Sequence, residues 1–340
     1  MSGEFTPEVV ADLQIMVANA LGRWQLSPDT TISLLNLSEN ATYALTDARG
    51  GRELVVRVHR IGYSSAEEIR SELAWINALR RDEVIETAAP FAGHDGELVQ
   101  RLESPSGAPS RYAVAFERLA GKKPDPGNDA VHWFERLGEL TARMHRHAKS
   151  WTLPSGFRRK RWDLEAMVGP NAYWGSWRAA IGLDPPGTAA IEQALRFIRR
   201  RVELFGMGPE RFGLVHADLH LANLLVDEPH LRIIDFDDCG FSWFVYDFAT
   251  AVSFIEHEPV VPQLLGAWLA GYRKTVPLSP EDGTEIPTFV VLRRILLTAW
   301  LASHAETPAA RQLGAAYTSG TVMLAQQLVR GEFLSQAALI

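Results

Sequence analysis

The chain has 340 residues, of which 46% are hydrophobic, and it carries a formal net charge of −7. This length and apolar content are enough for a sizeable core divided between two lobes or domains. The acidic balance argues against nucleic acid or an anionic membrane as the main partner. The one cysteine, Cys239, excludes an intramolecular disulfide framework and suits a reducing compartment.

The N-terminal segment "MSGEFTPEVVADLQ" contains acidic residues and has no apolar core, so it does not read as a signal peptide. No uninterrupted apolar run approaches the roughly 20 residues that span a bilayer. We therefore expect a soluble, cytoplasmic protein with no membrane partner.

The first third of the chain predicts an antiparallel sheet of about five strands with one long helix. The helix falls within 64–81, with Ser64 or Ser65 as its N-cap and apolar residues at the spacing of one helix face. A hairpin turn is expected at 47–51, where glycine tolerates positive φ. The β-prone segments are 31–37, 41–47, 52–60, 90–95, 97–102 and 111–119.

Around 120–129 the composition shifts to Gly, Pro and charged residues, which indicates a linker. Beyond it, helical patterns occupy 131–148, 188–204, 259–276, 286–304 and 308–330, and the one clear β interruption is 213–240. The predicted fold is α+β with two lobes: a small antiparallel β lobe (1–119), a hinge (120–130) and a larger, mainly helical lobe (131–340). Clefts between lobes are favoured places for small-molecule sites.

The β interruption, "GLVHADLHLANLLVDEPHLRIIDFDDCG", is rich in oxygen and nitrogen ligands. Two strands, 224–226 and 231–236, are joined by a turn, and their antiparallel pairing brings Asn223 beside Asp235. An amide oxygen next to a carboxylate is a hard oxygen site that suits Mg²⁺ bound to phosphate. Asp218 precedes Asn223 by five residues and could accept a proton from a hydroxyl. The arrangement indicates phosphoryl transfer.

His216-x-Asp218-x-x-x-x-Asn223, followed by Asp235 in "IDFDD", resembles the catalytic and metal segments of the aminoglycoside phosphotransferase superfamily. This superfamily includes choline and ethanolamine kinases, type II homoserine kinases and a bacterial stress response kinase, all with protein-kinase-like folds. The resemblance implies ATP and Mg²⁺ as cofactors, Asp218 as the catalytic base, and Asn223 and Asp235 as metal ligands. His216 would organise the catalytic loop, and Asp247 would anchor its backbone.

By the same resemblance, the first lobe holds the nucleotide. Main-chain N–H groups of Glu39 and Asn40 would face phosphate oxygens, although no Gly-x-Gly-x-x-Gly is present. Main-chain groups from Glu117 to Leu119 would meet the adenine.

Arg57 stands where the family normally has a phosphate-binding lysine. Arginine keeps the positive charge but presents a planar fork in place of a compact ammonium. Its expected partner is a helix glutamate, Glu68 or Glu72, of which Glu72 matches the family better.

The acceptor is expected to be a hydroxyl of a small molecule: an amino alcohol, a homoserine-like compound, a sugar or an aminoglycoside. Asp237 and Asp238 would add negative charge that suits an amine. Alternatives are a protein Ser/Thr kinase of the same fold, or a pseudokinase-like binding module because of Arg57. A more remote alternative is a metal hydrolase that uses His216, Asp218 and His220.

Other conspicuous residues are expected to have structural roles. His145 and His147 would cap or pack at a helix end, and Trp174 and Trp177 would pack between helices. The basic run at 157–162 would form a solvated face, and Cys239 would be an interior thiol.

Overall fold

The computed structural model describes residues 5–124, 130–305 and 307–335. The chain divides into two compact units. The first comprises Met1–Asp82, Thr87–Ala120 and Leu153–Arg158, and the second comprises Glu83–Glu86, Gly121–Thr152 and Arg159–Ile340. Of the hinge predicted at 120–130, residues 125–129 lie outside the described residues.

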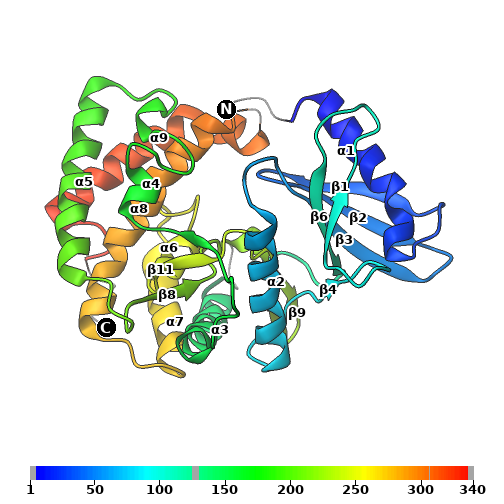
Figure 1. Cartoon of the computed structure of the whole chain (residues 1–340). Coiled ribbons are helices and arrows are strands. Elements are labelled where there is room, and N and C mark those ends of the chain that lie inside the picture. The colour runs from blue at the N-terminus through cyan, green and yellow to red at the C-terminus, as the bar shows by residue number, and fades with distance from the viewer. Residues whose placement is uncertain (1–4, 125–129, 306, 336–340) are drawn as a thin grey trace. The chain divides into compact units, whose positions relative to one another are not determined.

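The first unit is built on an antiparallel sheet. Within its described residues six strands take part, in the order β1-β2-β3-β6-β4 with β5 also paired to β6 (Figure 1). The predicted 90–95 strand is shorter than expected, because the Gly93 N–H bonds to the Glu97 carbonyl and turns the chain at once. The strands are β1 (Thr31–Leu37), β2 (Ala41–Asp47), β3 (Arg52–Val58), β4 (Pro90–Phe91), β5 (Val99–Leu102) and β6 (Arg111–Glu117).

The two faces of this sheet have different chemistry. Helix α1 (Pro7–Asn19) and the short helix η1 (Leu21–Trp24) share one buried cluster with alternate residues of the central strands, such as Tyr43 and Val56. Because neighbouring residues of a strand point to opposite faces, Arg57 points away from this cluster. Helix α2 (Ala66–Arg81) carries Glu72, the buried partner of Arg57. Ser65 caps the N-terminus of this helix in a capping box with Glu68.

The second unit is mainly helical. Most predicted helices agree with the structure within a few residues, but α8 begins six residues before its predicted start, at Pro280, because Ser279 and Asp282 form a capping box there. The helices are α3 (Ala130–Ser150), α4 (Leu164–Val168), η2 (Trp177–Ala179), α5 (Pro185–Phe205), η3 (Leu221–Asn223), α6 (Tyr246–Ala251), α7 (Val261–Arg273), α8 (Pro280–Ser303) and α9 (Pro308–Arg330).

Two small β elements interrupt these helices. The predicted hairpin is present as β9 (Leu224–Asp227) and β10 (His230–Ile233), so its second strand ends three residues earlier than expected. A sheet of β7 (Lys160–Arg161), β11 (Gly240–Trp243) and β8 (Phe212–Val215) was not predicted. These strands of two to four residues are too short for an alternating pattern to show.

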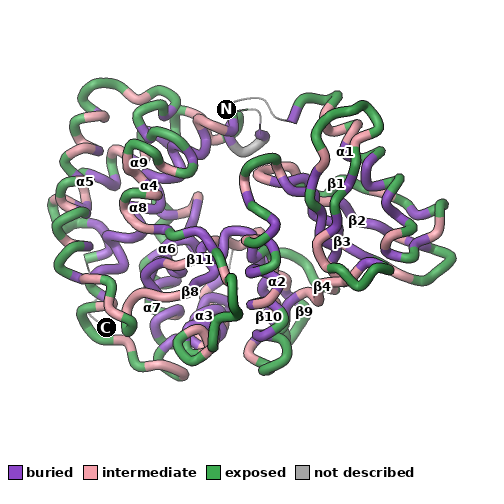
Figure 2. The backbone as a smooth tube through the Cα atoms, viewed as in Figure 1, coloured by how far each residue is buried: buried purple, intermediate pink, exposed green. Residues whose placement is uncertain are grey.

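Helix α8 is the core helix of the second unit. By length and composition alone this helix could cross a membrane, but 89% of its most apolar 18-residue window is buried within the protein. Figure 2 shows α8 mostly in the buried colour. This burial identifies α8 as a core helix. Arg293 and Arg294 lie within it and are also buried.

Helices α3 and α7 pack against each other through glycines. A Cβ atom added at Gly138 of α3 would overlap the carbonyl oxygen of Trp268, and one added at Gly271 of α7 would overlap that of Glu135. The two backbones therefore approach more closely than any side chain at these positions would permit.

We predict that Gly271→Ala destabilises the protein by about 1–3 kcal/mol, because the added methyl forces α3 and α7 apart. Gly266→Ala on the same helix is the control, since Gly266 is exposed and a Cβ there meets nothing within 4 Å. The control should be neutral or more stable by up to about 1 kcal/mol. Urea unfolding midpoints measure both variants, and equal midpoints would contradict the close-packing explanation.

Candidate active site

The loop from His216 to Asn223 is held by one buried carboxylate. Asp247, at the start of α6, accepts the His216 N–H at 3.1 Å and the Ala217 N–H at 2.7 Å. Thr250, one turn later, accepts the Leu219 N–H at 2.9 Å. Ala217 is thereby fixed at φ 66°, a left-handed conformation that non-glycine residues seldom adopt. The predicted role of Asp247 as a backbone anchor is confirmed.

Asp247 is itself held by a residue that the sequence analysis misjudged. His145 of α3 contacts the Asp247 Oδ2 through Nε2 at 2.9 Å and the Tyr272 hydroxyl of α7 through Nδ1 at 2.9 Å. The helix-end role expected of His145 is wrong: the side chain is buried and supports the loop from behind. Nothing in "ARMHRHAK" distinguishes it from its neighbour His147.

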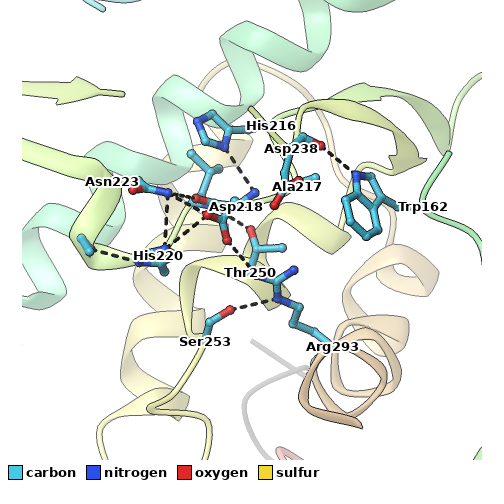
Figure 3. A network of polar contacts seen from close by, with 12 residues as sticks. Trp162, His216, Ala217, Asp218, His220, Asn223, Asp238, Thr250, Ser253 and Arg293 are labelled. Carbon is cyan, nitrogen blue, oxygen red and sulfur yellow. Dashed lines mark hydrogen bonds and ion pairs between the residues drawn. The ribbon is translucent and has the colours of Figure 1, made fainter. Parts of the chain in front are cut away.

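Asp218 lies at the centre of the polar network in Figure 3, with both carboxylate oxygens engaged. Arg293 Nη2 donates to Oδ1 at 2.7 Å, and Asn223 Nδ2 donates to Oδ2 at 2.8 Å. Burial alone would raise the pKa of Asp218, but the neighbouring His220 and Arg293 outweigh it and leave the pKa well below its usual range. The carboxylate is therefore ionised and fixed in orientation.

The two histidines of the loop serve different purposes. His216 is buried, its Nε2 contacts the Ile234 carbonyl at 3.2 Å, and its Nδ1 accepts the Asp218 N–H at 3.3 Å. Burial lowers the pKa of His216, so it is a neutral loop organiser with both nitrogens committed to backbone. His220 lies 3.3 Å from Asp218 Oδ2; burial opposes its charge, but Asp218 raises its pKa overall.

This arrangement argues against the metal-hydrolase alternative. In the described part of the chain, no three His, Cys, Asp or Glu side chains gather as metal ligands. His216 points its nitrogens at backbone, so it is not a third ligand beside Asp218 and His220.

The hairpin brings Asp235 next to Asn223 along the backbone. The Ile234 N–H donates to the Asn223 carbonyl at 3.0 Å, and Asp235 follows with φ 63°. This left-handed turn takes Asp235 out of the strand to an exposed position. Asn223 directs its Nδ2 at Asp218, and Asp235 exposes its carboxylate; oxygens of these two types fit Mg²⁺, which uses few protein ligands, and their roles as metal ligands stay predictions.

Asp238 does not provide the free negative charge that was expected of it. Lys160 Nζ lies 3.2 Å from Asp238 Oδ1, and both side chains are buried. Arg159 is also buried and donates to the carbonyl of Cys239 at 2.6 Å and to that of Asp237. The solvated face expected at 157–162 is therefore wrong for Arg159 and Lys160: Lys160 pairs with the Asp238 carboxylate, and Arg159 holds the backbone at the end of the hairpin segment.

Arg293 is the site residue that the sequence analysis missed. Its guanidinium stacks over Trp174 at 5.1 Å from the ring centroid, and Trp174 in turn packs against Trp162 with ring centroids 5.3 Å apart. The predicted packing role of Trp174 and Trp177 is confirmed, since both are buried. The available signal was a pair of arginines within the apolar run "FVVLRRILLTAW".

In the first unit, the predicted pairing of Arg57 with Glu72 is confirmed. Arg57 Nη2 lies 2.7 Å from each Glu72 oxygen, and the two side chains are 5% and 0% exposed. The guanidinium also lies 5.5 Å from the centroid of the Phe116 ring. Glu68, the other candidate, instead accepts the Ser65 N–H at the start of α2.

The segments predicted to contact the nucleotide's phosphates and adenine form hydrogen bonds with other residues of the first unit. Asn40 Oδ1 accepts the Arg60 N–H at 3.1 Å, which ties the β1–β2 turn to the end of β3. The Glu117 N–H donates a hydrogen bond to the Ala89 carbonyl at 2.9 Å. A main-chain contact to adenine from this segment therefore depends on carbonyl groups or on Leu119, and the roles of Glu39 and Asn40 stay predictions.

Comparison with known proteins finds relatives among phosphotransferases. The model of the phosphotransferase enzyme family matches residues 31–281. The solved structure of a microcompartment-associated aminopropanol kinase is 40% identical, with a TM-score of 0.86 over 94% of this chain and 98% of that one. Amicoumacin kinase of Bacillus subtilis (strain 168) is 25% identical over 292 residues, which are 83% of this chain and 82% of that protein.

A third protein, amicoumacin kinase hAmiN, was solved in complex with AMP-PNP, Ca²⁺ and Ami. It is 22% identical, with a TM-score of 0.78 over 97% of each chain. The α+β, protein-kinase-like fold predicted from the sequence is confirmed. The chain therefore belongs to the phosphotransferase enzyme family and is a small-molecule kinase.

Proposed function

We propose that this kinase transfers the γ-phosphoryl group of ATP to the hydroxyl of a short amino alcohol, with Mg²⁺ as the metal. The observation that carries the reaction type is the Asp218 carboxylate, held by Asn223 on one oxygen and Arg293 on the other. The substrate class is supported by the 40% identity to an aminopropanol kinase over almost the whole chain. ATP and a divalent ion are supported by the AMP-PNP and Ca²⁺ bound to a protein of the same fold.

In the proposed reaction, Asp218 accepts a hydrogen bond from the acceptor hydroxyl and receives its proton as the acceptor oxygen bonds to the γ-phosphorus. The bond from that phosphorus to the bridging oxygen breaks, and ADP leaves. Asn223 and Asp235 would hold Mg²⁺, which neutralises phosphate charge when bound. Arg57, fixed by Glu72, would contribute positive charge to the nucleotide phosphates.

The low pKa of Asp218 fits this role. A strong base is unnecessary where the acceptor proton is lost late, and phosphoryl transfer depends mainly on positioning and charge neutralisation. A carboxylate that stays ionised at all physiological pH values is always ready to orient the hydroxyl.

An acceptor panel with ATP and Mg²⁺ tests the proposed substrate. Aminopropanol and ethanolamine should give ADP formation coupled to a phosphorylated product, whereas propanol, which lacks the amine, should have a kcat/KM lower by at least tenfold. Homoserine, choline, an aminoglycoside, amicoumacin and a serine-containing protein complete the panel. Equal rates for propanol and aminopropanol would contradict recognition of an amine.

Asp218→Asn tests the role of the carboxylate. Removing a general base lowers kcat by about 10²- to 10⁴-fold, while ATP affinity, measured by calorimetry, should change less than threefold. Asn preserves the shape of Asp218 and can still contact Arg293, so the thermal midpoint reports any loss of folding. An equal loss of ATP binding and turnover would exclude the proposed role.

Arg57→Met and Arg57→Lys test the nucleotide contact. The Met variant should raise the KM for ATP by about tenfold or more, because it removes the positive charge that would face the phosphates and leaves Glu72 buried without its cation. The Lys variant keeps the charge and should fall between Met and the natural chain. Arg57→Met combined with Glu72→Met separates the two effects: it should recover thermal stability but not ATP affinity. Unchanged ATP affinity in all three variants would exclude Arg57 from the nucleotide site.

A further inference from the structure

A guanidinium in the centre of α8 requires an explanation. Arg293 is 2% exposed, and most of its neighbours along the helix are Val, Leu and Ile. A buried cation is costly unless it is paired and hydrogen-bonded. Replacing a buried ion pair as a whole with apolar side chains of similar volume is often neutral or stabilising, whereas removing one partner alone is destabilising. Packing alone therefore does not account for Arg293.

The bonds of Arg293 are distributed over all three of its nitrogens. Nη2 donates to Asp218 Oδ1 at 2.7 Å, Nε donates to Ser253 Oγ at 3.2 Å, and Nη1 lies 3.4 Å from the Tyr246 hydroxyl. Figure 3 shows the side chain rising from its helix toward Asp218, with Ser253 beside it. The two neutral partners and the Trp174 ring fix the plane of the guanidinium, so the short bond to Asp218 has a fixed direction.

The adjacent arginine provides an internal comparison. Arg294 is equally buried but faces Glu256, to which Nη1 donates at 2.5 Å, and its guanidinium stacks over the Tyr317 ring at 4.1 Å. Glu256 and Tyr317 are bonded to each other at 2.8 Å. Arg294 thus belongs to a closed structural network within the helical core, whereas Arg293 is directed at the Asp218 carboxylate.

We propose that Arg293 is a positioning residue for phosphoryl transfer: its guanidinium holds Asp218 Oδ1, so that the carboxylate is presented to the acceptor hydroxyl in one orientation. This proposal rests on the role proposed above for Asp218. With Asn223 on Oδ2 and Arg293 on Oδ1, the carboxylate cannot rotate about its Cβ–Cγ bond without breaking a charge-assisted hydrogen bond. Oδ2 already faces both Asn223 and His220, so Oδ1, which accepts from Arg293, has a second lone pair to accept the substrate's proton.

The test is a double-mutant cycle on kcat with Arg293→Met and Asp218→Asn. Arg293→Met should lower kcat by about 10- to 100-fold, the equivalent of losing a hydrogen bond to a charged group, and should change the KM for ATP less than threefold. In the Asp218→Asn background, the same substitution should lower the residual kcat by less than threefold, because Arg293 acts through the carboxylate.

Arg294→Met is the matched control. It removes a buried arginine one position away, so its thermal midpoint should fall at least as far as that of Arg293→Met while kcat changes less than threefold. A purely structural Arg293 would instead give kcat losses that follow the loss of folded protein equally in both variants. Such a result would overturn the proposal.

Arg293→Lys replaces Arg293→Met in the cycle if the Met variant does not fold. The ammonium keeps the charge without the fork, so kcat should fall at least threefold, and this loss should vanish in the Asp218→Asn background. Wild-type kcat in Arg293→Lys, or losses that multiply in the double variant, would overturn the positioning role. If Asp218→Asn alone keeps wild-type kcat, the proposed role of Asp218 fails, and the positioning role fails with it.

Discussion

The geometry of the second unit's site depends on one buried carboxylate. Asp247 receives two consecutive N–H groups, those of His216 and Ala217, and thereby imposes the left-handed conformation that the chain adopts just before Asp218. A strained residue persists only where its surroundings over-determine it. Here they do, since His145 from α3 and Tyr272 from α7 extend the network behind Asp247. The close backbone approach of α3 and α7 at Gly138 and Gly271 is therefore connected to the position of the loop.

Three charges in the interior of the second unit are neutralised locally. Asp218 has Arg293, Asp238 has Lys160, and Arg294 has Glu256. Fixed pairs of this kind cost desolvation but leave little net field at a distance. Under the proposed function, charge that develops during transfer would be met by groups already in position, and Asp235, which is exposed at its turn, would bind Mg²⁺.

The sequence predicted those features that local pattern encodes. Periodicity located the strands of the first unit, α2 and most long helices, and the spacing of Asp218, Asn223 and Asp235 indicated the hairpin. The local pattern could not predict the contacts of Arg293 and His145. These residues meet Asp218 and Asp247 across 75 and 102 residues of sequence, respectively. Arg159 and Lys160 were misjudged for a related reason. Their partners lie 78–80 residues further on, and a basic run without visible partners resembles a solvated surface.

Helix α8 shows why such long-range contacts matter for the proposed role of Asp218. A helix buried on every side tolerates few polar residues, yet α8 carries one arginine toward the site and another into the core network. Replacing either ion pair as a whole with apolar residues would remove a desolvation cost, whereas removing an arginine alone would leave its carboxylate partner without a cation. The pair of Arg293 and Asp218 therefore costs desolvation, and under the proposed role it provides a rigid carboxylate. Under the role proposed for Asp218, part of the folding free energy of the second unit is committed to the orientation of that carboxylate.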